Sequence, residues 1–317
     1  MHRPTRTRWF PTLLAFTLAA CGACSGGPSG PGPGPEGPTG RIFFEWIPEG
    51  AIGSQPWVYD FREDGASRVP IWFPQARDPS VDTAGTSIAF APPGTDLVIV
   101  SLKDTTQIEV WSMSHPAISQ PSLSSDGALL AWVRPVGGQG AAIDLLDRAS
   151  GEVTLLALFE QMTNLDVVHW FAGGDSVLTR ATRNGVPVYH VVQIDGTRTE
   201  MFGFAPAFGA WAVAVSADEQ WIALGGPRPG GVLDEAAPYR VEIWDLRRRA
   251  LRQTIALPHV SGWLAWSPDG RYVAHAPSQL LEKRAVLELL DRTTGERKAI
   301  IPGEGFHLGA KELTWIR

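Results

Sequence analysis

The chain lacks cysteine beyond position 24, and this absence limits what its folded part can contain. Both cysteines lie within the first 24 of the 317 residues. Residues 25–317 therefore hold neither a disulfide framework nor a cysteine-based zinc site. Charge is also sparse, because charged residues make up 19% of the chain and the formal net charge is −6. This balance predicts no nucleic-acid partner, since such binding needs a basic face.

The motifs of common catalytic centres are missing as well. The sequence contains no G-x-S-x-G nucleophile elbow, no H-E-x-x-H zinc motif and no D-x-D-x-D-G calcium loop. Some serine hydrolases combine a β-propeller with a separate α/β-hydrolase domain, and this sequence has no segment left over for such a domain. We therefore predict a protein that is not an enzyme, with no catalytic residue, no metal site and no cofactor.

The N-terminus has the pattern of a secretory signal. Arg3, Arg6 and Arg8 precede a short apolar run over residues 9–20, which is shorter than the roughly 20 residues of a membrane-spanning helix. The run ends in Leu18-Ala-Ala-Cys21. This sequence resembles the bacterial lipobox, which implies that the Cys21 thiol receives diacylglycerol and becomes the first mature residue. We predict a lipoprotein signal peptide over residues 1–20 and lipidation at Cys21.

A tether follows the predicted cleavage site. Residues 22–40 contain eight Gly and five Pro, and such a segment can extend to about 60 Å. Residue 22 is Gly rather than Asp, so the lipoprotein resemblance implies sorting to the outer membrane or cell surface. Cys24 is either a second acylation site or a spare thiol. We predict that residues 21–40 anchor an exported body to the bacterial cell envelope.

Residues 41–317 repeat a hairpin pattern six times. The clearest copy is 263–274, in which Ser267-Pro-Asp-Gly270 separates two apolar runs. Pro, Asp and Gly favour a tight turn. Five copies end at Ala89, Ala131, Leu178, Ala223 and Ala274, at intervals of 42, 47, 45 and 51 residues, and Ile42-Phe43-Phe44 supplies a sixth. A period in the forties with four short strands is typical of a propeller blade.

A second hairpin follows in each repeat, and the chain ends complete the pattern. The turns at 147–152 and 291–296 have related sequences. The first repeat lacks an opening strand, whereas residues 312–316 look like an opening strand with nothing after it. Pairing the two ends would remove two open sheet edges. We predict an all-β fold over residues 41–317, a six-bladed β-propeller with four antiparallel strands per blade and a C-terminal strand that closes the first blade.

The repeat resembles that of the TolB family. The resemblance is carried by Ser267-Pro-Asp-Gly270, by the Tyr-Val-Ala that follows it and by the 291–296 hairpin, and it extends over the whole body. It implies a propeller of WD40-like repeats and specifies fold rather than function. TolB proteins carry an α/β domain ahead of the blades, where this chain has a tether. Asp126, Asp218 and Asp269 occupy equivalent turn positions, where we expect them to stabilise their own turns.

Long connections are predicted on one face of the propeller. The insertions at 225–239 and 276–284 reach this face, and the opposite face is expected to hold only short structural turns. Three histidines on connections between blades either converge at one mouth or remain separate. The aromatic residues on such connections either pack between blades or form an apolar binding patch. The candidate partner-binding residues are His115, Phe202, Phe204, Phe208, His259, Phe306 and His307.

The leading hypothesis is a lipoprotein with a monomeric propeller that binds a protein or peptide partner through the long-loop face. One alternative is a metal-dependent propeller enzyme acting on a sugar acid or lactone, for which Asp82 and Asp166 are the nearest ligand candidates. A carbohydrate-binding propeller is another. His169 in a first strand either faces the channel or is buried and hydrogen-bonded. The basic turn Arg247-Arg248-Arg249 is either solvated or contacts an anionic lipid or polymer.

Overall fold

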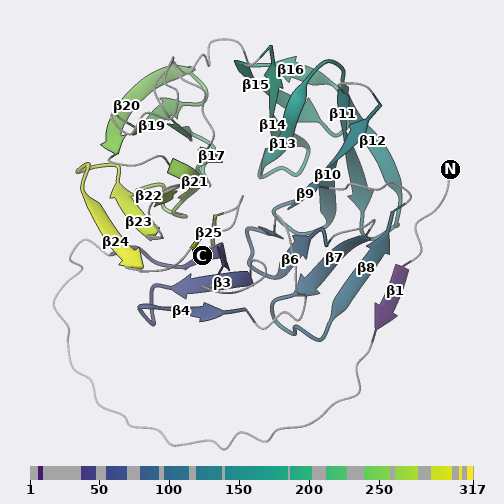
Figure 1. The fold of residues 1–317 in the computed structure, drawn as a ribbon, viewed down its shortest axis with the longest axis horizontal. Helices are drawn as coiled ribbons and strands as arrows, with labels where there is room; N and C mark the ends of the chain where they lie inside the picture. The colour runs from purple at the N-terminus through teal and green to yellow at the C-terminus, as the bar shows by residue number, and fades with distance from the viewer. Residues whose placement is uncertain are drawn as a thin grey trace, which may run out of the picture.

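Six antiparallel sheets surround a central axis (Figure 1). No helix is present among the residues described, and none of them forms a helical segment of membrane-spanning length and hydropathy. This arrangement confirms the predicted six-bladed propeller. The computed structural model describes residues 6–9, 37–47, 55–69, 79–92, 96–113, 119–137, 140–184, 186–201, 212–226, 239–257, 261–277, 287–301, 307–308 and 313–316.

The first three blades hold the N-terminal half of the chain. The strands of blade 1 are β2 (Arg41–Ile47), β3 (Gln55–Asp60) and β4 (Gly65–Arg68), joined by the C-terminal β25 (His307–Leu308) and β26 (Thr314–Ile316). Those of blade 2 are β5 (Ser80–Val81), β6 (Ser87–Phe90), β7 (Asp96–Ser101) and β8 (Ile108–Ser112), with β1 (Arg6–Trp9) paired to the outer edge of β8. Those of blade 3 are β9 (Ser119–Leu123), β10 (Leu129–Val136), β11 (Gly140–Asp147) and β12 (Val153–Phe159).

The other three blades repeat the same up-and-down order. The strands of blade 4 are β13 (Thr163–Trp170), β14 (Ser176–Arg183), β15 (Val186–Gln193) and β16 (Arg198–Glu200). Those of blade 5 are β17 (Ala212–Val215), β18 (Trp221–Gly226), β19 (Tyr239–Asp245) and β20 (Ala250–Leu257). Those of blade 6 are β21 (Ser261–Trp266), β22 (Tyr272–Pro277), β23 (Leu287–Asp291) and β24 (Arg297–Ile301).

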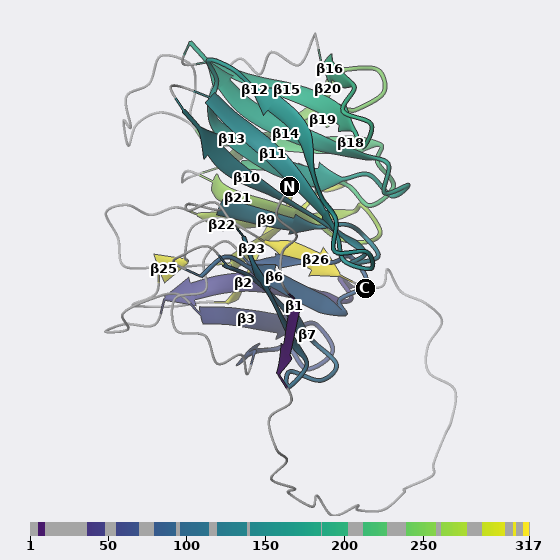
Figure 2. The ribbon, with the colours of Figure 1, turned by 90° about the vertical axis from the view of Figure 1, so that its right-hand side faces the viewer.

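The C-terminal strand closes the ring as predicted. β26 pairs antiparallel with β2, and Thr314 lies opposite Phe43. The structure adds a second closing element, because β25 pairs with the far end of the same strand, where His307 lies opposite Ile47. Figure 2 shows the C-terminus on one face of the ring and β25 on the other. We name the face that holds the C-terminus the short-turn face, because it carries the turns within each hairpin of a repeat. The face that holds β25 is the long-loop face.

The register read from the sequence corresponds to one structural position. Ala89, Ala131, Leu178, Ala223 and Ala274 all lie in the second strand of their blade, and so does Phe43. Each is paired with a residue of the innermost strand. These innermost partners are Ser80, Ser122, His169, Ala214, Ala265 and Thr314.

The hydrophobic core lies between the blades. Each junction between neighbouring blades contains one cluster of buried side chains, so six clusters hold the described ring together. Tryptophans at the ends of two inner strands also form hydrogen bonds across these junctions. The Nε1 of Trp170 donates to the carbonyl oxygen of Ser122 at 3.0 Å, and that of Trp266 donates to Ala214 at 3.1 Å. A blade therefore buries its apolar faces only when both neighbours are in place.

Candidate functional site in the central channel

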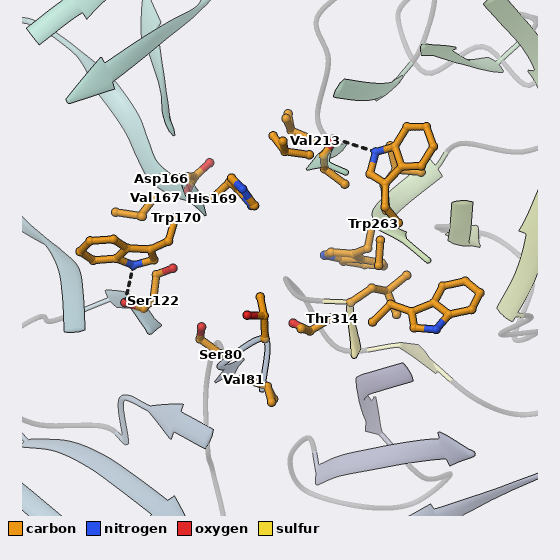
Figure 3. Close-up of a pocket in the computed structure, with 18 of the residues that line it drawn as sticks. Ser80, Val81, Ser122, Asp166, Val167, His169, Trp170, Val213, Trp263 and Thr314 are labelled. Atoms are coloured by element: carbon orange, nitrogen blue, oxygen red, sulfur yellow. Dashed lines mark hydrogen bonds between the residues drawn. The ribbon is translucent and has the colours of Figure 1, made fainter. Parts of the chain in front are cut away.

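The innermost strands of all six blades line one cavity of about 250 Å³ (Figure 3). These strands are β5, β9, β13, β17, β21 and β26. The cavity exists because the inner partners of the register residues are small in five blades, where they are Ser, Thr or Ala. His169 is the one large side chain at this level. The lining includes Thr83, Ser125 and Ala217 from short turns, so the cavity reaches the short-turn face that we expected to be purely structural.

The cavity has a polar half and an apolar half. The polar side chains of the lining come from blades 2, 3 and 4, with Thr314 as the exception. Blades 5, 6 and 1 contribute mainly Ala, Val, Leu and Trp. Figure 3 shows Ser80, Ser122, Asp166 and His169 on one side, and Val213 and Trp263 on the other. A ligand in this cavity would meet hydrogen-bonding groups on one wall and apolar surface on the opposite wall.

Irregularities in three inner strands place the larger side chains of the site. β9 has one extra residue near Gln120, β13 has one before Asp166 and another before His169, and β21 has one before Trp263. Gln120 also has a φ of 54°, which is uncommon for a residue other than glycine. Bulges bend a strand and redirect a side chain, and they are frequent beside binding sites. The fold therefore departs from regular pairing where the cavity acquires its functional groups.

The charged groups of the polar wall neutralise each other. The guanidinium of Arg180 on β14 donates to the Asp166 carboxylate on β13, and both side chains are partly buried. Tyr189 lies close to this pair, and burial raises the pKa of its hydroxyl to about 12, so it remains protonated. The wall thus presents a salt bridge and neutral polar groups rather than a net charge.

His169 supplies a neutral imidazole that points into the cavity (Figure 3). Burial lowers its pKa to about 4, so the ring is uncharged at neutral pH. Its Nε2 is buried and has no hydrogen-bond partner among the residues described, and the same holds for Oε1 of Gln120. A buried polar atom without a partner costs about 1–3 kcal/mol.

Two observations on the described residues bear on the metal-dependent enzyme alternative. No group of three or more His, Cys, Asp or Glu side chains within the described residues is placed to hold a metal ion. The two ligand candidates of the enzyme hypothesis are already occupied. Asp82 accepts the backbone N–H of Thr86 at 2.7 Å and its hydroxyl at 2.6 Å, and Asp166 is paired with Arg180. The geometry supports binding by hydrogen bonds and apolar contact.

Most of the predicted partner-binding residues lie outside the described part of the chain. Of that set the structure places only the backbone of His307, in β25 at the long-loop end of β2. The residues outside the description are Cys21, His115, Phe202, Phe204, Phe208, His259 and Phe306. The structure therefore neither brings these residues together nor separates them.

The turn aspartates have the structural role that we predicted. Asp126, Asp218 and Asp269 each accept a hydrogen bond from the serine two residues earlier and from a backbone N–H two residues later. These bonds stabilise the hairpin turn within each blade. The three carboxylates therefore do not form a shared site.

Sequence reasoning missed Gln120, Arg180 and Trp263. Trp263 lies within a predicted strand and Arg180 lies two residues beyond one, and only the tertiary arrangement shows which of these side chains face the axis. Gln120 precedes Pro121, and a proline within a strand pattern is a signal for a bulge. That signal was available in the sequence.

Comparisons with known proteins agree with the fold. The structure superposes on TolB from Acinetobacter baumannii with a TM-score of 0.69 and 18% identity, covering 87% of this chain and 66% of that one. It superposes on a putative TolB from Agrobacterium tumefaciens with a TM-score of 0.61 and 18% identity, covering 84% and 92%. A chain from a nidogen/laminin complex matches with a TM-score of 0.62 and 9% identity, covering 86% and 97%.

The fold and the site together define an all-β propeller whose central channel has one polar wall and one apolar wall. Its particular form is a TolB-like six-bladed propeller, as the sequence resemblance implied. No protein-family model matches the chain, and no curated protein sequence does. At these levels of identity the likeness shows the fold, and activity has to be argued from the site.

Proposed function

We propose that the protein is an exported bacterial lipoprotein whose propeller binds a protein or peptide partner without catalysing a reaction. The supporting observation is the channel, with polar groups on blades 2 to 4 and apolar groups on blades 5, 6 and 1. Such a division suits a segment that offers backbone amides to one wall and an apolar side chain to the other. The partner approaches over the long-loop face, and part of it enters the channel.

An extended peptide fits the chemistry of the polar wall. Peptide groups are neutral and carry both a donor and an acceptor, which suits a wall whose charges are paired. Gln120 lines this wall with an amide group, and the neutral ring of His169 can donate or accept according to its tautomer. Trp263 and Val213 offer apolar contact across the cavity. The expected occupant is a short segment with a small or planar apolar side chain.

Export and anchoring rest on the N-terminal sequence. Cleavage before Cys21 would remove residues 1–20 and with them β1. β8 would then be an open outer strand, as β4, β12, β16, β20 and β24 are. Acylation of Cys21 is tested by metabolic labelling with palmitate in cells that express the wild type and Cys21→Ser. Label in the wild type alone supports the anchor, whereas equal label in both refutes it.

Partner binding is tested with channel variants of the lipidated protein. Envelope proteins are crosslinked to wild type, to Gln120→Ala and to Trp263→Ala, and they are identified by mass spectrometry. Leu251→Ala is the matched control, because this leucine is exposed on the outer strand β20. We expect a partner that both channel variants lose and the control retains. A partner recovered equally from all four proteins would refute binding in the channel, and binding of a purified sugar that both variants abolish would favour the carbohydrate alternative.

A further inference from the structure

The chain enters the propeller on the short-turn face. Arg41, the first residue of β2, lies opposite Ile316 at the end of β26. The preceding residues are held there by hydrogen bonds: the Gly40 carbonyl accepts the N–H of Phe61 at 3.2 Å, and the Thr39 carbonyl accepts the indole N–H of Trp315 at 2.8 Å. Residues 39 and 40 therefore lie on this face, and the predicted tether would connect it to the membrane.

Charge on the short-turn face is concentrated in two neighbouring blades. The turn between β19 and β20 carries three consecutive arginines, and that between β23 and β24 is followed by Arg297 and Lys298. The windows 245–252 and 291–298 together hold seven cations and three carboxylates, and the first-hairpin turns of the same blades, at 216–220 and 267–271, add one cation and three carboxylates. The matching turns of blades 1 to 4 carry no excess of cations. We name as the basic sector Arg247, Arg248, Arg249, Arg252, Arg292, Arg297 and Lys298.

One side-chain contact links the two parts of the basic sector across neighbouring blades. The guanidinium of Arg292 in blade 6 lies over the ring of Trp221 in blade 5, 4.6 Å from its centroid. Asp245 pairs with Arg248 at 3.4 Å and with Arg252 at 3.0 Å. These pairs leave the cations accessible, because the Arg248 side chain remains 75% exposed. Arg247, Arg297 and Lys298 are exposed as well.

We propose that the basic sector lies against the anionic phospholipid headgroups of the membrane that holds Cys21. This inference rests on the proposed lipid anchor. Attraction between basic side chains and an anionic bilayer acts within a Debye length of about 8 Å at physiological ionic strength. The anchor keeps the short-turn face within reach of the bilayer, because the tether, which can extend to about 60 Å, joins the propeller on that face. The sector thereby turns the long-loop face away from the bilayer.

The rest of the molecule favours the same orientation. Removal of residues 1–20, which hold three Arg and no acidic residue, leaves 24 basic and 33 acidic side chains, a formal charge of −9. A body with this charge is repelled by an anionic surface unless a basic patch faces it. The basic sector is such a patch, so one orientation is attracted and the others are repelled. Lipid binding and partner binding then occupy opposite faces.

The test couples the mature chain to vesicles through its natural attachment point. Cys21 becomes the single thiol in a Cys24→Ser protein, because residues 25–317 contain none, and it is joined to a maleimide lipid. Vesicles contain phosphatidylcholine alone or mixed with phosphatidylglycerol. The rate of arginine modification by phenylglyoxal is measured at each site by mass spectrometry. We expect rates at Arg247, Arg248 and Arg249 to fall roughly threefold or more on the anionic vesicles and to recover at high salt, while Arg183 at the long-loop end of β14 is unchanged.

Two variants with matched changes of charge complete the test. In R247Q/R248Q/R249Q we expect Arg292 and Arg297 to lose their protection, because the sector is broken. R62Q/K103Q/R148Q removes the same charge from turns of blades 1, 2 and 3 on the same face, and here protection should persist. Equal rates on the two kinds of vesicle, or an equal fall at Arg183, would overturn the inference. Chemical coupling makes this result independent of whether cells acylate Cys21.

Discussion

Closure of the ring by Ile316 provides the most direct test of the fold. Its side chain is 3% exposed and packs in the cluster between blades 1 and 2, with Phe43, Val81 and Ile88. The fit is tight, since a Cβ added to Gly85 would lie 2.2 Å from Cδ1 of Ile316. Ile316→Ala would remove three carbon atoms from this junction and leave the backbone pairing of β26 unchanged.

The expected loss of stability follows from the volume that is removed. Truncation of a buried isoleucine to alanine typically costs about 2–5 kcal/mol, and isoleucine to valine about 0.5–1.5 kcal/mol. Ile316 is the last of the described residues, and a cavity so close to the end of a strand can partly collapse. We therefore expect about 2–4 kcal/mol for Ile316→Ala and about 1 kcal/mol for Ile316→Val. The midpoint of thermal unfolding should fall by about 5–10 °C for Ile316→Ala.

The assay is urea unfolding of the mature chain, made unlipidated by Cys21→Ser and followed by tryptophan fluorescence and circular dichroism. Leu251→Ala is the matched control, because Leu251 is 45% exposed on an outer strand. This control should change the free energy of unfolding by less than about 0.5 kcal/mol. A loss for Ile316→Ala no larger than that of the control would refute closure through β26. Such a result would also remove the argument that residues 39 and 40 are held on the short-turn face.

Three further predictions concern single interactions. Trp266→Phe should destabilise the protein by about 1–2 kcal/mol, because the Ala214 carbonyl loses its indole donor. In urea unfolding, a loss of stability no larger than that of Leu251→Ala would contradict a stabilising role for this hydrogen bond. His169 has a pKa of about 4 in the folded protein and near 6.5 in the unfolded chain, so the unfolded chain binds a proton first as pH falls. The free energy of unfolding should therefore decrease between about pH 6.5 and about pH 4, by at most about 3 kcal/mol. His169→Phe should remove this pH dependence, and an unchanged pH dependence in the variant would show that another group causes it. Burial opposes ionisation of Asp291, but hydrogen bonds from Arg271 and Thr293 outweigh it and lower the pKa to about 2, so its stabilisation is complete above pH 3.8 and disappears as pH falls through 2. Asp291→Asn should therefore be less stable at pH 7 by about 2 kcal/mol and less sensitive to acid below pH 4, and equal acid sensitivity in the two proteins would be the contrary result.

The sequence by itself determined the repeat architecture. Each hairpin is local, because apolar runs of strand length flank turns such as Ser267-Pro-Asp-Gly270, whose residues favour the required backbone angles. The period and the missing opening strand then implied six blades and a C-terminal closing strand. Asp126, Asp218 and Asp269 were interpretable for the same reason, since each bonds within its own turn.

Only the tertiary structure decided where the candidate site lies and what it contains. Whether a strand residue faces the axis depends on bulges, and those near Gln120, Asp166, His169 and Trp263 shift the alternation of side chains from regular pairing. The pairing of Asp166 with Arg180 depends on register between strands, and the second closing strand β25 depends on contact with β2 across the whole chain. Local preferences carry no information about such contacts, so the sequence determines the blades, and their assembly around the axis determines the channel.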